Sequence, residues 1–285
     1  MHDIYDRLSS AVVVRNKDTE TVDTMRILLT NDDGIHAPGL LALYEALAGE
    51  HEIHVVAPEM EMSAVGHAIT LSSPLRVRDV TRKGKFFGHG VSGTPADCVK
   101  IAVQELLQAP PDVVLSGINP GSNVGVNVLY SGTVSAATEG AFLGIRSAAV
   151  SLDNLRDPDF RFAAAFSKEL VRYLAENGLR HGTALNVNIP ALPPSQITGV
   201  AVTRQGVGRF KESFDRRIDP RGNAYYWLTG ETPLEENAPD TDAAALRQGK
   251  ITITPIHFDL TSEEDLERLK KGPLPELERL GALPA

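Results

Sequence analysis

The sequence predicts an α/β fold, a doubly wound and mostly parallel sheet followed by a C-terminal β-rich extension with a hairpin. Short apolar runs, which are typical of buried parallel strands, alternate with segments whose leucines repeat at helical spacing. The helical segments have the length of crossover connections, which are right-handed in parallel sheets. After Pro190 the strand-like runs follow one another without such helices, and this change marks the extension.

The first part of the chain predicts a regular alternation of strands and helices. In order, we expect a strand at 26–30, a helix at 39–48, strands at 52–57, 75–80 and 86–91, and a helix at 95–107. Gly49 and Pro58 lie where the first helix and the second strand should end. Pro95 fits the first turn of the second helix, and the pair Pro110–Pro111 ends it.

The second part contains a long loop of unusual composition. We expect, in order, a strand at 113–116, a loop at 117–132, a helix at 133–143, a strand at 147–151 and a helix at 157–177. The loop is rich in Gly and Asn, and Gly178 ends the last helix. In the extension we expect strands at 200–205, 225–228 and 251–255, a charged segment at 211–222 between them, and a C-terminal helix near Thr261.

These segments divide the chain into three parts. Residues 1–24 are polar and lack the layout of a signal peptide, so we interpret them as a flexible N-terminal extension. Residues 25–190 form the predicted α/β core, and residues 191–285 form the C-terminal extension. The charged hairpin region of this extension suggests association, and we expect a homo-oligomer.

Composition limits the class of ligand and the compartment. The 285 residues are 42% hydrophobic and 23% charged, which is enough for a sizeable core. The net charge of −9 makes long nucleic acid an unfavourable ligand, although a bound cation can still attract a small anion. No apolar stretch approaches the roughly 20 residues that cross a membrane. The single cysteine, Cys98, excludes an intramolecular disulfide, so we expect a cytoplasmic protein.

Three polar loops follow the carboxyl ends of predicted parallel strands, at residues 31–34, 58–63 and 117–119. Ligands of open α/β sheets bind at this edge. Asp32 and Asp33 are adjacent there, and two ionised carboxylates in a half-buried site require a compensating cation. Oxygen ligands favour Mg²⁺ or Mn²⁺. Taken alone, Asp-Asp-Gly is also a sequence typical of a tight turn.

A second feature suggests an anion site. The glycine- and asparagine-rich loop ends at Ser131-Gly132-Thr133, where a helix begins. The free N–H groups and the positive dipole end of a helix bind phosphate. The competing interpretation is that Ser131 or Thr133 only caps the helix, and capping and binding can coexist. His67 stays open as a phosphate donor or an acid, whereas Cys98 is interpreted as a core residue.

Five motifs occur in order: TNDDG at 30–34, APExxxS at 57–63 with Gly66-His67, SGTPADC at 92–98, SGIN at 116–119 and SGTVS at 131–135. Together they resemble the survival-protein E (SurE) nucleotidases over nearly everything from Met25 to about Leu260. The resemblance implies a Rossmann-like fold and a 5′(3′)-nucleotidase of acid-phosphatase type that acts on nucleoside monophosphates. Some members also trim short polyphosphate. It further implies a dimer or tetramer assembled through swapped elements of the C-terminal extension.

The resemblance also implies a ligand set for one divalent metal, Mg²⁺ or Mn²⁺, per subunit: Asp32, Asp33, Ser63 and Asn119. Such an ion polarises a phosphoryl oxygen and lowers the pKa of a bound water. We expect Asp32 to be the general base of the reaction. The substrate-binding residues that we expect are Asn31, Thr94, Asn123, Ser131, Gly132 and Thr133.

Other protein classes fit the motifs less well. Haloacid-dehalogenase-type phosphatases use a covalent aspartate but normally show Asp-X-Asp, whereas the acids here are adjacent. Receiver domains need a phosphoacceptor aspartate at the end of the central strand, where this chain reads Val-Leu-Ser-Gly-Ile-Asn. A dinucleotide-binding oxidoreductase would need Gly-X-Gly-X-X-Gly after the first strand. A non-catalytic regulator that binds metal or nucleotide stays open as an alternative.

Overall fold

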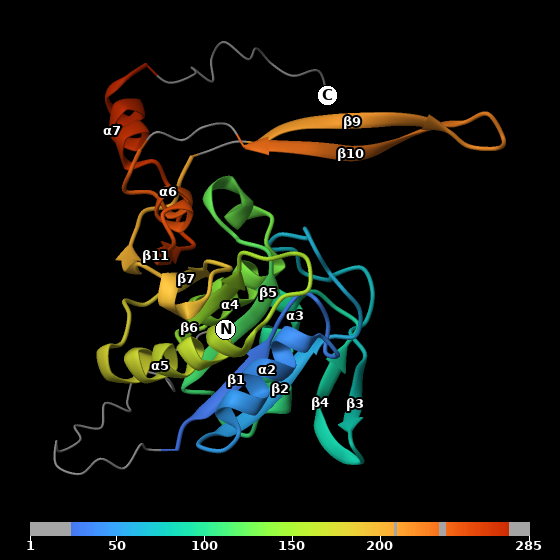
Figure 1. The fold of residues 1–285 in the computed structure, drawn as a ribbon, viewed down its shortest axis with the longest axis vertical. Helices are drawn as coiled ribbons and strands as arrows, with labels where there is room; N and C mark the ends of the chain where they lie inside the picture. The colour runs from blue at the N-terminus through green and yellow to red at the C-terminus, as the bar shows by residue number, and fades with distance from the viewer. Residues whose placement is uncertain (1–23, 208–209, 234–237, 274–285) are drawn as a thin grey trace, which may run out of the picture.

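The computed structural model describes residues 24–207, 210–233 and 238–273. Within these residues, nine strands form one sheet in the order β3-β4-β2-β1-β5-β6-β7-β11-β8 (Figure 1). The strands from β4 to β7 are parallel to one another, while β3 pairs antiparallel with β4 and β11 pairs antiparallel with β7. The predicted doubly wound, mostly parallel sheet is therefore confirmed.

Most of the predicted ranges overlap an element of the structure. The strands of the sheet are β1 (Arg26–Thr30), β2 (Glu52–Pro58), β3 (Val77–Arg82), β4 (Lys85–Val91), β5 (Val113–Pro120), β6 (Arg146–Leu152), β7 (Thr183–Ile189), β8 (Gly199–Val202) and β11 (Lys250–His257). The α-helices are α2 (Pro38–Leu47), α3 (Pro95–Ile101), α4 (Gly132–Phe142), α5 (Arg161–Asn177), α6 (Asp242–Arg247) and α7 (Glu263–Lys271). Helix α3 continues as a π-helical segment, Ala102–Leu106.

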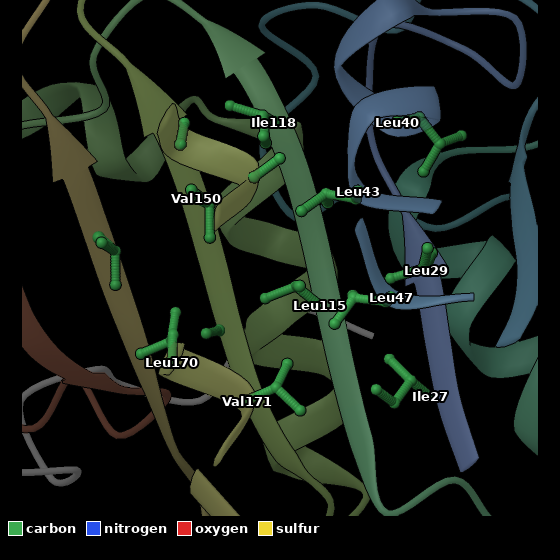
Figure 2. Packing of buried hydrophobic residues seen from close by; sticks show 14 of the residues in the cluster. Ile27, Leu29, Leu40, Leu43, Leu47, Leu115, Ile118, Val150, Leu170 and Val171 are labelled. Atoms are coloured by element: carbon green, nitrogen blue, oxygen red, sulfur yellow. The ribbon is translucent and has the colours of Figure 1, made fainter. Parts of the chain in front are cut away.

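The sheet is covered on both faces because its central strands are apolar on both sides. On one face, α2 and α5 pack on odd-numbered β1 residues such as Ile27 and Leu29, as Figure 2 shows. On the other face, α3 and α4 pack around Leu28. Alternation along the strand puts Thr30 on the α3 and α4 side. The residues that follow β1 therefore emerge beside the N-terminus of α4.

For the segment after β6, one prediction was wrong and one strand was missed. The predicted helix at 157–177 begins only at Arg161, since Asp157 has a φ of +52°, which a right-handed helix does not allow. Asp159 instead accepts a hydrogen bond from the Arg161 backbone N–H. We also did not predict β7, because its two asparagines resemble loop residues, although its alternating pattern is that of a strand.

The loop predicted at 117–132 is also partly regular. Strand β5 extends to Pro120, and a 3₁₀ helix, η2, spans Gly125–Leu129. The bonds that hold this segment come from β6, β7 and the C-terminal region, which lie far away in the sequence. Local composition therefore did not reveal it.

The C-terminal region contributes β11 and β8 to the edge of the main sheet. It also forms a separate hairpin. This hairpin consists of β9 (Phe210–Ile218) and β10 (Ala224–Pro233), which pair antiparallel and project away from the sheet (Figure 1). The predicted hairpin is confirmed, but much of the charged segment at 211–222 is strand rather than connector. Residues 1–23 of the predicted N-terminal extension lie outside the described residues. In the described part of the chain, no helix is long and apolar enough to cross a membrane.

Candidate metal and phosphate site

Asp32 lies at the centre of the candidate site, directly beyond β1. Only 5% of its surface is exposed, and the Thr133 hydroxyl donates a hydrogen bond to its Oδ1. Burial raises the pKa of Asp32, and the bonds from the Thr133 hydroxyl and from backbone groups including those of Gly132 and Thr133 offset this effect only in part. An ionised Asp32 therefore needs more positive charge than the protein itself supplies.

An ionised Asp33 also needs a compensating positive charge. Its Oδ2 is buried without a hydrogen-bond partner. Burial, followed by the negative charges of Asp32 and Glu61, raises the pKa of Asp33 to about 7. A divalent cation next to both carboxylates would reverse these effects, because a nearby positive charge favours the ionised form.

The loop after β2 is attached to the same point. The backbone N–H of Met62 donates to the carbonyl of Asp32 at 2.7 Å, and Ile35 donates to the carbonyl of Pro58 at 2.8 Å. These bonds hold the loop against the end of β1, and the charge of Glu61 acts on Asp33. The Ser63 hydroxyl is exposed and donates to Glu61 Oε1 at 2.6 Å. Ser63 is thus bonded to Glu61, the residue whose charge acts on Asp33.

Asn119 approaches from the neighbouring strand, since β5 pairs with β1 and Ser116 is the partner of Thr30. Its side-chain nitrogen donates to the carbonyl of Gly121 at 2.7 Å. A cation would therefore be bound by the amide oxygen rather than by the nitrogen.

The available atoms fit a hard cation. Four buried oxygens near the ends of β1 and β5 have no hydrogen-bond partner: Thr30 Oγ1, Asn31 Oδ1, Asp33 Oδ2 and Ser116 Oγ. Unpaired buried oxygens are costly, so a cation or ordered water at this edge is expected. Within the described ranges no three His, Cys, Asp or Glu side chains gather as a metal cluster. The predicted donor set, two carboxylates with neutral oxygens, would suit Mg²⁺ or Mn²⁺.

The N-terminus of α4 packs against Asp32. Ser131 is the N-cap, and its hydroxyl accepts a hydrogen bond from Val134 N at 3.1 Å. Gly132 packs so closely on Asp32 that an added Cβ would lie 2.7 Å from the Asp32 Cβ. The Asp32 carboxylate thus meets the positive end of this helix, where a phosphate and a cation would both be favourable.

The family comparison agrees with this geometry. The family model described as Survival protein SurE matches residues 27–212. The chain belongs to the SurE family. It is 58% identical to the 5'-nucleotidase SurE of Syntrophobacter fumaroxidans over 87% of this chain and 99% of that protein. A second relative, the 5'-nucleotidase SurE of Syntrophus aciditrophicus, is 57% identical over 86% of this chain and 93% of that protein.

The SurE fold is supported by a solved structure as well. The crystal structure of the SurE protein from Aquifex aeolicus superposes with a TM-score of 0.75 at 40% sequence identity. The alignment covers 86% of this chain and 98% of that chain. The resemblance inferred from the five motifs is confirmed, and SurE membership implies dependence on a divalent metal.

The other predicted substrate residues of this SurE chain are held by structural bonds. Thr94 is the N-cap of α3, and its hydroxyl donates to the carbonyl of Ala68 at 2.7 Å. Asn31 donates through its side-chain nitrogen to the carbonyl of Gly34 at 3.0 Å. Asn123 donates through its side-chain nitrogen to Ser151 Oγ at 2.8 Å. Within the described part of the chain, none of these three side chains donates a hydrogen bond to the Asp32 carboxylate.

Two residues that hold Asn123 in this SurE chain were missed. Asn188 Oδ1 accepts a hydrogen bond from Asn123 N at 2.7 Å, and Asn186 Nδ2 donates to its carbonyl at 2.8 Å. Both side chains are buried on β7. The alternation of Leu185, Val187 and Ile189 with these asparagines was the signal that could have revealed them.

His67 belongs to a network of charged side chains centred on the buried Glu139. It contacts Glu139 Oε2 at 2.8 Å, and Lys100 Nζ donates to Glu139 Oε1 at 2.7 Å. Burial raises the pKa of Glu139, but the bonds from His67 and Lys100 outweigh burial, and the net pKa lies below its ordinary value. The network fastens the loop after β2 to α3 and α4.

Proposed function

We propose that this SurE-family protein is a divalent-metal-dependent phosphomonoesterase that hydrolyses nucleoside monophosphates to nucleoside and phosphate. The relatives named 5'-nucleotidase SurE, which align over nearly their full length, support the nucleotidase activity. The structural observation that carries the proposal is the contact between Asp32 and the N-terminus of α4. The contact puts the acids proposed to bind the cation next to the helix end proposed to bind the phosphate.

The proposed metal ligands are Asp32, Asp33, Ser63 and Asn119, and the proposed ion is one Mg²⁺ or Mn²⁺ per subunit. When bound, such an ion supplies Lewis-acid polarisation and makes water more acidic. The bond from Thr133 fixes the Asp32 carboxylate, which suits the proposed role of Asp32 as general base. The orphan oxygen of Asp33 would bind the ion.

The substrate's phosphate would bind at the start of α4. Its oxygens would accept hydrogen bonds from Ser131 and from N–H groups in the first turn of the helix. Gly132 and Thr133, whose donors bond to Asp32, would hold that carboxylate beside the phosphate. Asn31, Asn123 and Thr94 complete the proposed set. Because hydrogen bonds to β6 and β7 fix Asn123, it would line the phosphate site without moving when the substrate binds. Short polyphosphate offers the same terminal phosphate and is a proposed second substrate.

Assembly through the hairpin is the proposed source of a homo-oligomer, either a dimer or a tetramer. Phe214, Ile218, Tyr226 and Trp227 are each at least 58% exposed on this isolated two-stranded unit. Large exposed apolar patches mark interaction sites, and a lone hairpin has little stability in water. The cytoplasmic location expected from the single cysteine stays a prediction.

The test is phosphate release from AMP by the full-length protein, with Mn²⁺ or Mg²⁺ and with excess EDTA. We expect release only with metal, and we expect Asp32→Asn to reduce turnover at least about a thousandfold while the circular dichroism spectrum is unchanged. Near-normal activity of Asp32→Asn would refute the proposed metal site. A panel of 5′ and 3′ monophosphates and short polyphosphates would then define the substrate.

A further inference from the structure

A fully buried carboxylate outside the proposed site reaches the loop that carries Asn123. Asp242, the first residue of α6, has no exposed surface. Its Oδ2 accepts a hydrogen bond from Gly125 N at 3.0 Å, and its Oδ1 accepts bonds from Gly206 N at 2.9 Å and Ala243 N at 2.8 Å. A buried carboxylate with this set of donors is well satisfied.

Gly125 is the point where the loop turns toward α4. It begins the 3₁₀ helix η2, which leads through Tyr130 to the N-cap Ser131, and it has a φ of +58°. Its carbonyl accepts a bond from Gln205 Nε2 at 2.9 Å. Both backbone polar groups of Gly125 are therefore held by side chains of the C-terminal region, Gln205 and Asp242.

The two acceptor oxygens of Asp242 serve different segments. The bonds to Oδ1 join α6 to Gly206, which lies shortly before the hairpin strand β9. The bond to Oδ2 crosses 117 residues of sequence to the loop after β5. A side chain that only started α6 would need the first set of bonds alone. The Gly125 contact is the additional observation that requires another role.

We propose that Asp242 is a positioning residue for substrate binding. Through Gly125 it fixes the loop between Asn119 and Ser131 against the base of the hairpin, so that Asn123 and the α4 N-terminus keep their places around the phosphate. This inference rests on the proposed function, because it assumes that this loop binds the phosphate of the substrate. Asp242 does not touch the proposed metal ligands in the described structure.

The test compares three variants of the full-length protein. Asp242→Asn keeps the shape, but its amide has one acceptor oxygen and one donor, so at least one backbone N–H loses its bond. We expect the KM for AMP to rise about tenfold, as the loss of one charge-assisted bond allows, with kcat changed less than about threefold. Gln205→Ala removes the second hold on Gly125 without touching α6, and a smaller rise of KM is expected. Asp240→Asn changes an exposed acid two residues away and should leave KM unchanged.

Hydrogen exchange of residues 121–131 gives a second measurement that does not need activity. Faster exchange in Asp242→Asn and Gln205→Ala, with the half-activating Mn²⁺ concentration within about twofold of the unmodified protein, would support the proposal. A lower melting temperature with unchanged KM and unchanged exchange would overturn it. If Asp242→Asn does not fold, Gln205→Ala decides by the same two criteria. Absence of phosphate release from AMP by the unmodified protein would refute the proposed function, whereas the exchange result would still decide whether Asp242 holds the loop.

Discussion

The hydroxyl of Thr133 donates a hydrogen bond to Oδ1 of Asp32, although the two residues are 101 positions apart in the chain. This bond joins the end of β1 to the first turn of α4. It also lowers the pKa of Asp32 against the stronger effect of burial. The orientation and the charge of the proposed metal ligand therefore both depend on one threonine of the proposed phosphate site.

Replacing Thr133 with Val keeps the shape of the side chain and removes this donor. We expect kcat/KM to fall roughly 10–100-fold at neutral pH, since a hydrogen bond to a charged group is worth about 1.5–3 kcal/mol. The pKa of Asp32 should rise further, so the acidic limb of the pH–rate profile should move to higher pH. Thr138→Val is the matched control, because the Thr138 hydroxyl donates to the Val134 carbonyl within the same helix. Equal profiles for both variants would contradict the proposed role.

The close approach of Gly132 to Asp32 gives a steric prediction. An added Cβ would lie 2.7 Å from the Asp32 Cβ and 3.1 Å from Pro95 Cγ, so Gly132→Ala must push α4 away from the carboxylate. We expect a lower melting temperature, with overpacking costing about 1–3 kcal/mol, and at least about a tenfold loss of phosphate release. Gly49→Ala is the control, because nothing lies within 4 Å of the added atom. Full activity of Gly132→Ala would show that this contact is not required.

The raised pKa of Asp33 predicts a pH-dependent stability in the absence of metal. Its pKa is about 7 in the folded protein and near 3.8 when unperturbed. Between these values the folded state binds more protons than the unfolded state, so this group lowers the free energy of unfolding as pH rises through that window. Asp33→Asn lacks the titration. In EDTA, the melting temperature of Asp33→Asn relative to the unmodified protein should therefore increase from pH 4 to pH 7 and then level off.

Adding Mn²⁺ should make the melting temperature of the unmodified protein higher than that of Asp33→Asn. The unmodified protein should gain stability from the ion, since a ligand that binds only the folded state raises its melting temperature, whereas Asp33→Asn should gain little. Asp79→Asn is the control, because Asp79 is 74% exposed and pairs with His89 on the edge strands. If, in EDTA, the melting temperatures of Asp33→Asn and the unmodified protein differ by the same amount at pH 5 and pH 8, that result would mean that Asp33 does not titrate in this range.

Much of the core could be predicted from local patterns in the sequence. The apolar run of β1 followed by Asp32 and Asp33 identifies both a buried strand and its polar end, because both signals lie within a few residues. The rule that ligands gather at the carboxyl edge then predicts that α4 approaches β1, as the Thr133 contact shows. These predictions needed no knowledge of side-chain packing.

The supporting residues could not be predicted in this way, because their roles depend on distant partners. Asn186 and Asn188 are buried on β7, and their polar groups find partners in the distant loop at Asn123. Asp242 looks like an ordinary helix-start residue, and its bond to Gly125 depends on how the C-terminal region folds back over the sheet. The predicted start of α5 was also four residues early, because the positive φ of Asp157 cannot be seen in the local composition.

The hairpin gives the last prediction, which concerns assembly. Cross-strand pairing puts Phe214 opposite Leu228 and places Tyr226 on the same face, and all three are at least half exposed. An apolar face of this kind on a lone hairpin should be covered by a second subunit. We expect the unmodified protein to exceed its monomer mass of 30.7 kDa in analytical ultracentrifugation at micromolar concentration.

The double variant Phe214→Ser with Tyr226→Ser should sediment as a monomer, because serine removes most of the apolar area without altering the backbone pairing. Tyr173→Ser is the matched control, since Tyr173 is 51% exposed on α5, away from the hairpin, and should leave the mass unchanged. An oligomer that survives the double variant would assign assembly to another surface. If the unmodified protein sediments as a monomer, the hairpin must have a role other than self-association.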